Sequence, residues 1–363
     1  MRLLNTTTLQ FQEFFDSNRP IYATLSHRWD PVEVSFQDFQ QSQTKAGPGF
    51  EKIRSCCSFA AKQGRAWVWI DTCCIDKGSS AEISEAINSM YRWYENAVEC
   101  YAYLNDVPAH GLTTQIRNSL WFTRGWTLQE LLAPYRVVFL NCAWEIIGDR
   151  QCLAGLISDI TGIPELYLNR PGQLCNASVA MKMSWASRRM TSRLEDRAYS
   201  LLGLFGVNMP LLYGEGRNAF RRLQLEILKI SDDESIFAWR ETAHRTEFHG
   251  MLAARPEYFA NSGTIARRPF TNERPPYSMT HKGLKLHVPT HVVQGTTRIV
   301  FPLDCACDEE SLSLAIILCK VKGGSWARFQ CEKLMTVPSE DLWTRRDCSY
   351  PNRATMYVAQ PDG

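Results

Sequence analysis

The stretch Trp67-Val-Trp-Ile-Asp71, followed by an amphipathic run from Glu82 to Asn96, decides the fold class. The first segment is a short apolar run that ends in a polar residue, and the second repeats its apolar residues at helical spacing. The same alternation recurs through residues 1–150 and predicts βαβ units around a parallel sheet flanked by helices. The predicted strands are Tyr22–Leu25, Trp67–Asp71, Cys100–Leu104 and Arg136–Leu140.

Two helices are predicted between the first three strands. One runs from Ile53 to Gln63 and ends at Gly64, a residue that suits the left-handed position after a helix. The other runs from Glu82 to Asn96, with Ser79 or Ser80 available as its N-cap. An α/β fold is therefore expected for residues 1–150.

The rest of the chain changes character twice. Residues 151–240 read as a helical extension, with helices expected over 152–160, 179–188, 195–205 and 217–230 and a strand over Ser235–Trp239. Residues 241–363 contain short alternating runs broken by Pro and Gly, which predicts a smaller β-rich domain. Its expected strands are Gly283–Pro289, Thr297–Pro302 and Leu314–Leu318.

Composition excludes several classes of partner. The formal net charge is +2, from 40 basic and 38 acidic residues, so no bulk field argues for nucleic acid. No stretch approaches eighteen apolar residues, so no membrane span is expected. The 13 cysteines include no C-x-x-C spacing, so no metal site is expected, and their odd number favours reduced thiols in a cytoplasmic protein.

The run Arg124-Gly-Trp-Thr-Leu-Gln-Glu130 combines an arginine, an indole and a carboxylate. Trp126 and Glu130 are related as i and i+4, so on a helix they share a face. Apolar residues and then Pro134 follow Glu130, and a carboxylate in such surroundings is partly desolvated, which raises its pKa. The alternative is a surface glutamate on an amphipathic helix.

Polar residues also follow the predicted strands. Because the carboxyl ends of parallel strands meet at one edge of a sheet, we expect these residues to form one site. The mixture of hydroxyl, carboxylate, guanidinium and indole groups suits a nucleotide or another polar aromatic ligand. The predicted ligand-binding residues are Ser26, His27, Arg28, Trp29, Asp71, Cys74, Asp76, Arg124 and Trp126, with Glu130 on the neighbouring helix.

Each of these residues has a structural alternative. Ser26 could cap a turn, and His27 could be a hydrogen-bonded histidine on the surface. Trp29 could pack in the core. Asp71 and Asp76 suit turns, and Cys74 and its neighbour Cys73 suit inert buried thiols. A thiolate pair of one of these cysteines with His27 is a further catalytic option.

Common catalytic and nucleotide-binding motifs are missing from the sequence. It contains no G-x-x-x-x-G-K-[ST] phosphate loop, no G-x-G-x-x-G after a strand, no G-x-S-x-G and no H-E-x-x-H. These absences argue against P-loop nucleotidases, Rossmann dehydrogenases, elbow hydrolases and zinc proteases.

Three blocks resemble the signature of the fungal heterokaryon incompatibility (HET) domain. They are Tyr22-Ala-Thr-Leu-Ser-His-Arg-Trp29, Val68-Trp-Ile-Asp-Thr-Cys-Cys-Ile-Asp76 and Arg124-Gly-Trp-Thr-Leu-Gln-Glu130. The resemblance covers about residues 1–240, and the segment after 240 resembles the β-rich part that often follows. One departure is Asp30, where many members have a Gly after the Trp.

The resemblance implies nonself recognition and programmed cell death in fungi, and a distant kinship with flavodoxin-like TIR domains, some of which hydrolyse NAD. By that kinship Glu130 would be the catalytic residue of an NAD glycohydrolase, stabilising positive charge on the ribose. Trp29 or Trp126 would stack on a base, and Arg28 or Arg124 would bind phosphate. No cofactor is expected, because NAD would be the substrate.

Two further functions stay open beside the NAD glycohydrolase. One is a nonenzymatic signalling module that triggers death through partners, and the other is the cysteine-dependent hydrolase. For the partners we expect self-association and a separate sensor protein, since no Walker A motif or repeat is present. No nucleic-acid partner is expected.

Overall fold

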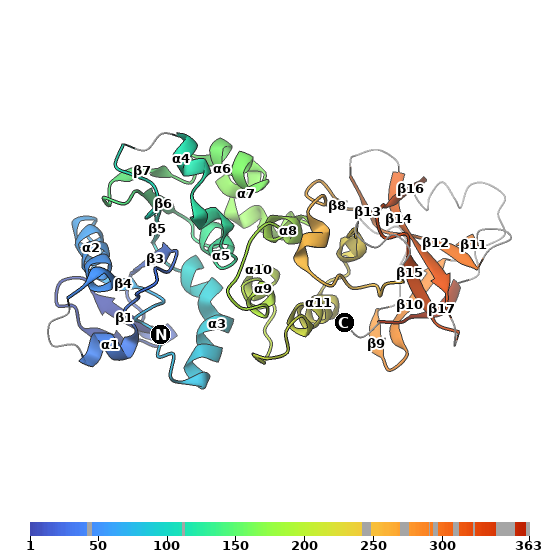
Figure 1. The fold of residues 1–363 in the computed structure, drawn as a ribbon, viewed down its shortest axis with the longest axis horizontal. Coiled ribbons are helices and arrows are strands. Elements are labelled where there is room, and N and C mark those ends of the chain that lie inside the picture. Colours follow the sequence, from blue (N-terminus) through green and yellow to red (C-terminus); the bar gives the residue numbers. More distant parts are fainter. Residues whose placement is uncertain are drawn as a thin grey trace. The chain divides into compact units, whose positions relative to one another are not determined.

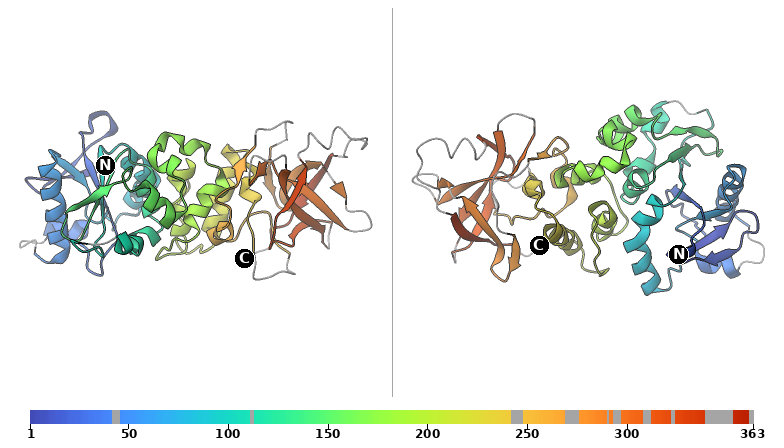
Figure 2. Two further views of the ribbon diagram at one scale, coloured as in Figure 1. Left: turned by 90° about the horizontal axis from the view of Figure 1, so that it is seen from above. Right: turned by 180° about the vertical axis from the view of Figure 1, so that it is seen from behind.

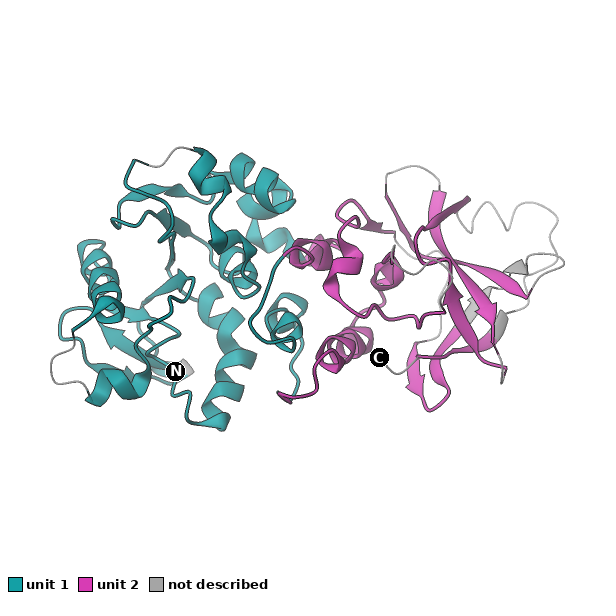
Figure 3. Cartoon of the chain, viewed as in Figure 1, with its two compact units in different colours: residues 1–174, 189–211 teal, residues 175–188, 212–363 magenta. Residues whose placement is uncertain are grey.

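The computed structural model describes residues 1–41, 46–110, 113–241, 248–268, 276–289, 291–292, 297–307, 312–321, 324–338 and 353–360. The chain divides into two compact units, coloured in Figure 3. The first contains residues 1–174 and 189–211, and the second contains residues 175–188 and 212–363. The helical segment predicted over 151–240 is thus shared between the two units.

A mixed sheet forms the core of the first unit. In the described residues it has seven strands in the order β2-β1-β4-β3-β5-β6-β7. Their bounds are β1 Arg2–Asn5, β2 Phe11–Glu13, β3 Ala23–His27, β4 Trp67–Trp69, β5 Glu99–Tyr103, β6 Val137–Leu140 and β7 Ile146–Asp149. The four central strands β4, β3, β5 and β6 are parallel, as the sequence predicts.

The outer strands of this sheet are antiparallel and were not predicted. On one side β1 pairs with β4 and β2 with β1, and on the other β7 pairs with β6. Numbered along the chain, the parallel strands lie in the order second, first, third, fourth. The connections therefore reverse direction between β3 and β5, so their carboxyl ends lie at a topological switch point.

Helices cover both faces of the sheet, as expected (Figures 1 and 2). Helix α2 (Pro48–Lys62) lies on one face, and α3 (Ser80–Glu95) and α5 (Thr127–Leu132) lie on the other. The further helices of this unit are η1 Asp16–Asn18, α1 Phe36–Gln41, α4 Thr113–Arg117, η2 Leu120–Thr123, α6 Ala154–Thr161, α7 Glu165–Asn169, α9 Asp196–Tyr199 and α10 Leu202–Phe205, with η3 Pro171–Asn176 at its boundary.

The predicted caps explain where α2 and α3 begin and end. The hydroxyl of Ser79 accepts a hydrogen bond of 3.3 Å from the backbone N–H of Glu82, so Ser79 is the N-cap of α3. Gly64, which follows the last residues of α2, has a φ of +73°. A side chain at this position would be strained, which is why a glycine ends the helix.

The second unit combines helices and 3-10 turns with a β-rich part. Its helical elements are α8 Val179–Ala186, α11 Asn218–Ile230, η4 Glu234–Phe237 and η5 Pro256–Phe259. The strand predicted over Ser235–Trp239 is wrong, because the carboxylate of Asp233 folds the chain back. Its Oδ1 accepts from the N–H of Ser235 (2.9 Å) and its Oδ2 from the N–H of Val179 (2.7 Å).

Antiparallel pairing dominates the β-rich part of this unit. Its described strands are β8 Ala266–Arg267, β9 Ser278–Thr280, β10 Gly283–Pro289, β11 His291–Val292, β12 Arg298–Pro302, β13 Cys305–Ala306, β14 Leu312–Lys320, β15 Trp326–Phe329, β16 Met335–Pro338 and β17 Arg353–Val358. The pair β15 and β17 is parallel.

Among all the described helices, none has the length and apolar character needed to cross a membrane.

Candidate functional site

Ser26 and Glu130 contact each other in the first unit, although the strand continues through Ser26 instead of ending before it. Ser26 lies near the end of β3, and α5 packs against that strand. The Ser26 hydroxyl donates a hydrogen bond to Oε2 of Glu130. Ser26 is fully buried and Glu130 is 5% exposed. Two residues 104 positions apart therefore share one buried polar contact.

Trp121 is a third member of this contact that sequence analysis missed. It lies in η2, and its indole Nε1–H donates to the Ser26 Oγ at 2.9 Å. Its side chain is 1% exposed and packs edge-on against Phe122 and Phe139. Trp121 lies five residues before Trp126 in the sequence, and only its aromatic side chain could have marked it as a site residue. We call Trp121, Ser26 and Glu130 the buried triad.

Burial sets the electrostatics of Glu130. Desolvation, with a smaller contribution from the negative charge of Asp71, raises the pKa of the Glu130 carboxyl to about 8. The hydrogen bond from Ser26 and the cations Arg124 and Arg189 act in the opposite direction and stabilise the ionised form. The neutral form of Glu130 therefore predominates at neutral pH.

Arg189 is a second residue that the sequence did not reveal. Its guanidinium donates to the backbone oxygen of Arg124 (3.0 Å) and to the hydroxyl of Thr127 (2.9 Å). Burial lowers the pKa of this guanidinium to about 10, so it stays protonated at neutral pH. Arg189 thus fixes the start of α5 and places a positive charge near Glu130.

Trp29, which follows β3, contacts the half-buried Asp71, which follows β4. The indole Nε1–H of Trp29 donates to Oδ2 of Asp71 at 2.9 Å. Trp29 is 39% exposed, and two cations lie close to its ring. Lys77 Nζ is 3.7 Å and the Arg124 guanidinium carbon 5.1 Å from the ring centroid. The result is a partly exposed indole ring with two cations over it.

His27 is buried and neutral, in contrast to the surface histidine that was one alternative. Desolvation lowers the pKa of its imidazole to about 3, and its Nε2 lies 3.9 Å from Asp71 Oδ1 and 3.8 Å from Glu33 Oε1. Neither ring nitrogen has a hydrogen-bond partner among the residues that the structure describes. An imidazole with so low a pKa is a weak general base.

Ion pairs hold the loop that follows His27. Lys52, which comes from α2, pairs with Asp30 at 2.8 Å and with Glu33. The side-chain amide of Asn105, after β5, donates to Asp30 Oδ1 at 2.7 Å. Asp30 thus fixes the loop through contacts with two other segments.

The two adjacent cysteines are buried thiols, and Cys73 is not activated. Cys73 and Cys74 are both buried, and desolvation raises the pKa of the Cys73 thiol well above its ordinary value. The sulfur of Cys74 accepts a hydrogen bond of 3.3 Å from the backbone N–H of Ile70. A nucleophilic cysteine needs a lowered pKa, so this geometry argues against the cysteine-dependent hydrolase.

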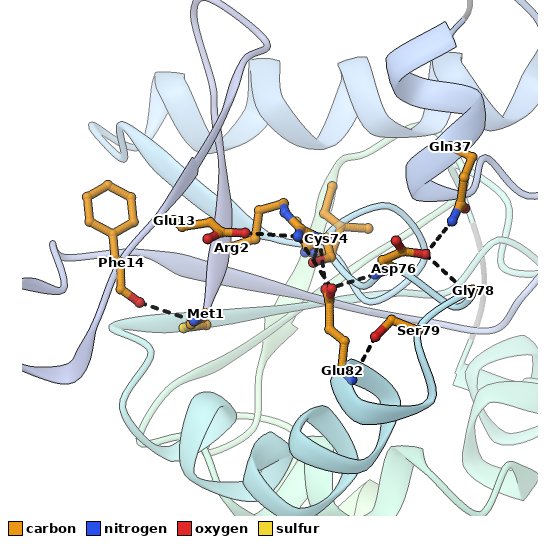
Figure 4. A network of polar contacts seen from close by, with 11 residues as sticks. Met1, Arg2, Glu13, Phe14, Gln37, Cys74, Asp76, Gly78, Ser79 and Glu82 are labelled. Atoms are coloured by element: carbon orange, nitrogen blue, oxygen red, sulfur yellow. Dashed lines mark hydrogen bonds and ion pairs between the residues drawn. The ribbon is translucent and has the colours of Figure 1, made fainter.

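Asp76 belongs to a separate network that holds the loop after β4 (Figure 4). Its Oδ1 accepts from the N–H of Gly78 (2.8 Å) and from Gln37, and its own N–H donates to Glu82 Oε1 (2.8 Å). Arg2 joins the network by donating to Glu82 (2.8 Å) and to the carbonyl of Cys74 (3.2 Å). These contacts give Asp76 the turn-forming role that was its structural alternative.

Arg28 and Trp126 lie apart from the contacts above. Arg28 is exposed, and Trp126 is half-buried at the N-cap position of α5. In the described part of the chain, no hydrogen bond or ring contact joins either side chain to Glu130.

Across the described residues, no group of three or more His, Cys, Asp and Glu side chains has a geometry that could hold a metal ion.

Comparison with known proteins matches part of this site to a family. Residues 22–113 match the family model described as heterokaryon incompatibility protein (HET), and residues 218–291 match a domain of unknown function (DUF8212). The first match includes the blocks around Ser26 and Asp71, and Glu130 lies beyond it. No solved structure matches the chain.

A vegetative incompatibility protein of Podospora anserina, HET-E-1, is 44% identical to this chain over 247 residues. The aligned part is 65% of this chain and 18% of that protein, so the chain spans a small part of its relative. The family match contains the first two of the three blocks identified in the sequence, and the third block, Arg124–Glu130, lies beyond it. Residues 22–113 therefore belong to the heterokaryon incompatibility (HET) family, and the chain is similar to a vegetative incompatibility protein.

Proposed function

We propose that this protein is an effector of heterokaryon (vegetative) incompatibility, which brings about programmed cell death in fungal nonself recognition. We further propose that it acts by cleaving NAD to nicotinamide and ADP-ribose at Glu130. The first part is supported by the HET family match and by the relative HET-E-1, which is named a vegetative incompatibility protein. The second part rests on the buried, hydrogen-bonded carboxyl of Glu130.

The strand order supports a TIR-like interpretation of the fold. The central parallel strands have the order second, first, third, fourth, which is also how flavodoxin-like sheets begin. In such sheets ligands bind beyond the carboxyl ends of the strands where the order reverses. Here that point lies between β3 and β5, and Ser26 is close to it.

The proposed reaction breaks the bond between the ribose C1′ and the nicotinamide nitrogen. The bonding electron pair leaves with nicotinamide, which becomes neutral, and positive charge develops on the ribose. Water then adds to C1′ and releases a proton, giving ADP-ribose. Ionised Glu130 stabilises the developing positive charge, and the low-dielectric surroundings strengthen that interaction. The cationic nicotinamide ring favours ionisation of Glu130 when the substrate binds.

The surroundings of Trp29 suit the rest of a dinucleotide. Lys77 and Arg124 lie over its partly exposed ring and offer positive charge for phosphates. In this proposal the two cations move from the ring onto the phosphates, and the ring then stacks on a base. In this proposal the protein self-associates when a separate sensor activates it, and the reaction takes place in the cytoplasm.

The test is to incubate the purified full chain with NAD and to measure nicotinamide and ADP-ribose by chromatography. Wild type is compared with Glu130→Ala, Glu130→Gln and the control Cys74→Ala, both free and artificially clustered. We expect nicotinamide from wild type and Cys74→Ala, and none from either Glu130 variant. Absence of nicotinamide from clustered wild type would refute the NAD glycohydrolase.

Burial also favours a second candidate, a nonenzymatic signalling module. Ser26 is fully buried and Glu130 is 5% exposed, which suits a polar contact that shapes the fold. The module is supported if clustered wild type yields no nicotinamide while Glu130→Ala still abolishes cell killing. In that case the three sequence blocks build an interaction surface instead of an active site.

A further inference from the structure

We propose that Trp121 and Ser26 are positioning residues for Glu130. The indole N–H of Trp121 directs the hydroxyl proton of Ser26 to Oε2 of Glu130, which leaves Oε1 as the oxygen that meets a ligand. The orientation of the Glu130 carboxyl depends only on the fold. Its role in catalysis rests on the proposed function.

Three separate elements supply the members of this buried triad. Trp121 comes from η2, Ser26 from β3 and Glu130 from α5. The indole N–H lies 2.9 Å from Ser26 Oγ, and the Ser26 hydroxyl in turn bonds Glu130 Oε2. All three side chains are buried, so water does not compete for these hydrogen bonds.

The direction of the hydrogen bonds follows from counting protons. An indole N–H only donates, so the oxygen of Ser26 must accept from Trp121. Ser26 has one proton, and within the described residues Glu130 is the acceptor that its hydroxyl reaches. Oε2 of Glu130 therefore accepts in both protonation states, and the neutral carboxyl carries its own proton on Oε1.

Other charged and titratable groups surround Glu130 without taking the place of Ser26. Asp71 after β4, Arg124 before α5 and Arg189 act on the carboxyl through their charges. The charge of Glu130 in turn acts on the buried Tyr94 of α3 and Cys100 of β5. Tyr94 donates its hydroxyl proton to the carbonyl of Leu25 at 3.1 Å. In the described residues, no hydrogen bond reaches Oε1 of Glu130.

Packing alone is the alternative explanation for Trp121. Its ring makes edge-on contacts with Phe122 at 5.1 Å and with Phe139 at 5.6 Å between centroids. Trp121→Phe keeps an aromatic ring against these neighbours and removes the N–H donor. The substitution therefore separates the hydrogen bond from most of the packing.

The test is a direct titration of Glu130 in the full chain. In protein labelled with ¹³C-glutamate, the infrared band of the protonated Glu130 carboxyl is identified by its absence from Glu130→Gln. We expect Ser26→Ala to raise the titration midpoint by about one to two units, because a hydrogen bond that stabilises the ionised form is lost. Trp121→Phe should raise it by a smaller amount, because the Ser26 hydroxyl is then free to accept from the carboxyl.

Thr24→Val is the matched control. Thr24 is a fully buried residue of the same strand, and its variant loses a hydroxyl that makes no contact with Glu130 in the described residues. Its midpoint should equal that of wild type. The proposal is overturned if Ser26→Ala and Trp121→Phe both titrate like Thr24→Val, or if either lowers the midpoint.

This titration uses no substrate, so its result is independent of NAD cleavage. A raised midpoint together with no nicotinamide from wild type refutes the proposed function and leaves the positioning intact. If wild type does cleave NAD, the rising limb of kcat/KM against pH should move upward in Ser26→Ala by the same shift. A purely structural role would lower activity at all pH values without moving that limb.

Discussion

Wild type should lose stability as the pH rises from about 5 to 8 because of Glu130, and the variant Glu130→Gln should not show this loss. Burial raises the pKa of this carboxyl from the ordinary 4.5 to about 8 in the folded state. Between these two pH values the folded chain holds a proton that the unfolded chain has released. Folded-state stability therefore falls as the pH rises through this window, and the contribution is flat below it. Glutamine resembles the neutral carboxyl and does not titrate.

The size of the effect follows from the shift. Each pKa unit corresponds to about 1.4 kcal/mol, so between about pH 5.5 and 7.5 Glu130 should cost wild type about 2 to 3 kcal/mol of unfolding free energy. Urea titrations of wild type and Glu130→Gln at several pH values measure the difference between the two proteins. That difference should grow in favour of the variant by this amount.

The control for this prediction is Glu51→Gln, which removes an exposed glutamate from the same unit. Its difference from wild type should change far less over the same pH range. A difference between Glu130→Gln and wild type that stays constant with pH, or that shrinks, would show that Glu130 is not held neutral by burial.

Three other predictions follow from the structure. Gly203→Ala should destabilise the protein by about 1 to 3 kcal/mol or more in urea unfolding, because the added Cβ would lie 2.0 Å from the Cβ of Tyr91. Iodoacetamide should alkylate the exposed Cys142 and leave the buried Cys73 unmodified in the folded protein, as read by mass spectrometry. Binding of an NAD analogue with a methylene in place of the ribose ring oxygen should release a proton from Glu130 near pH 7, measured by calorimetry in buffers of different ionisation enthalpy.

Each of these has its own control. Gly172→Ala introduces a Cβ with no atom within 4 Å and should leave stability nearly unchanged. Equal loss in both glycine variants would refute the clash argument. Rapid labelling of Cys73 would reopen the cysteine-dependent mechanism. Glu130→Gln should abolish the proton release, and a wild type whose binding heat is independent of buffer would contradict a neutral Glu130.

The central sheet was predictable because its strands have a strong local signal. The run Trp67–Asp71 is apolar, and the helix after it has both amphipathic spacing and a serine cap, so local preference and tertiary structure agree. The rule that ligand sites form at the carboxyl ends of parallel strands then predicted that Ser26 would lie close to Glu130. Prediction failed at Ser235–Trp239, where Asp233 accepts two backbone hydrogen bonds that no local pattern reveals.

The residues that sequence analysis missed share a cause. Trp121, Arg189 and Arg2 act through contacts with partners that are distant in sequence: Trp121 bonds Ser26 95 positions away, and Arg2 bonds Glu82 80 positions away. His27, the last residue of β3, is buried, whereas Arg28 and Trp29, which follow the strand, are exposed. Residue type alone could not separate them.

The most direct test of the central claim is to measure NAD in fungal cells that express the full chain from an inducible promoter. NAD content and viability are followed together after induction, for wild type, Glu130→Gln and the control Cys74→Ala, with all three proteins present at equal levels. We predict that NAD falls before viability is lost in wild type and Cys74→Ala, and that neither falls in Glu130→Gln. Death of wild-type cells at unchanged NAD would contradict the claim that Glu130 kills by cleaving NAD.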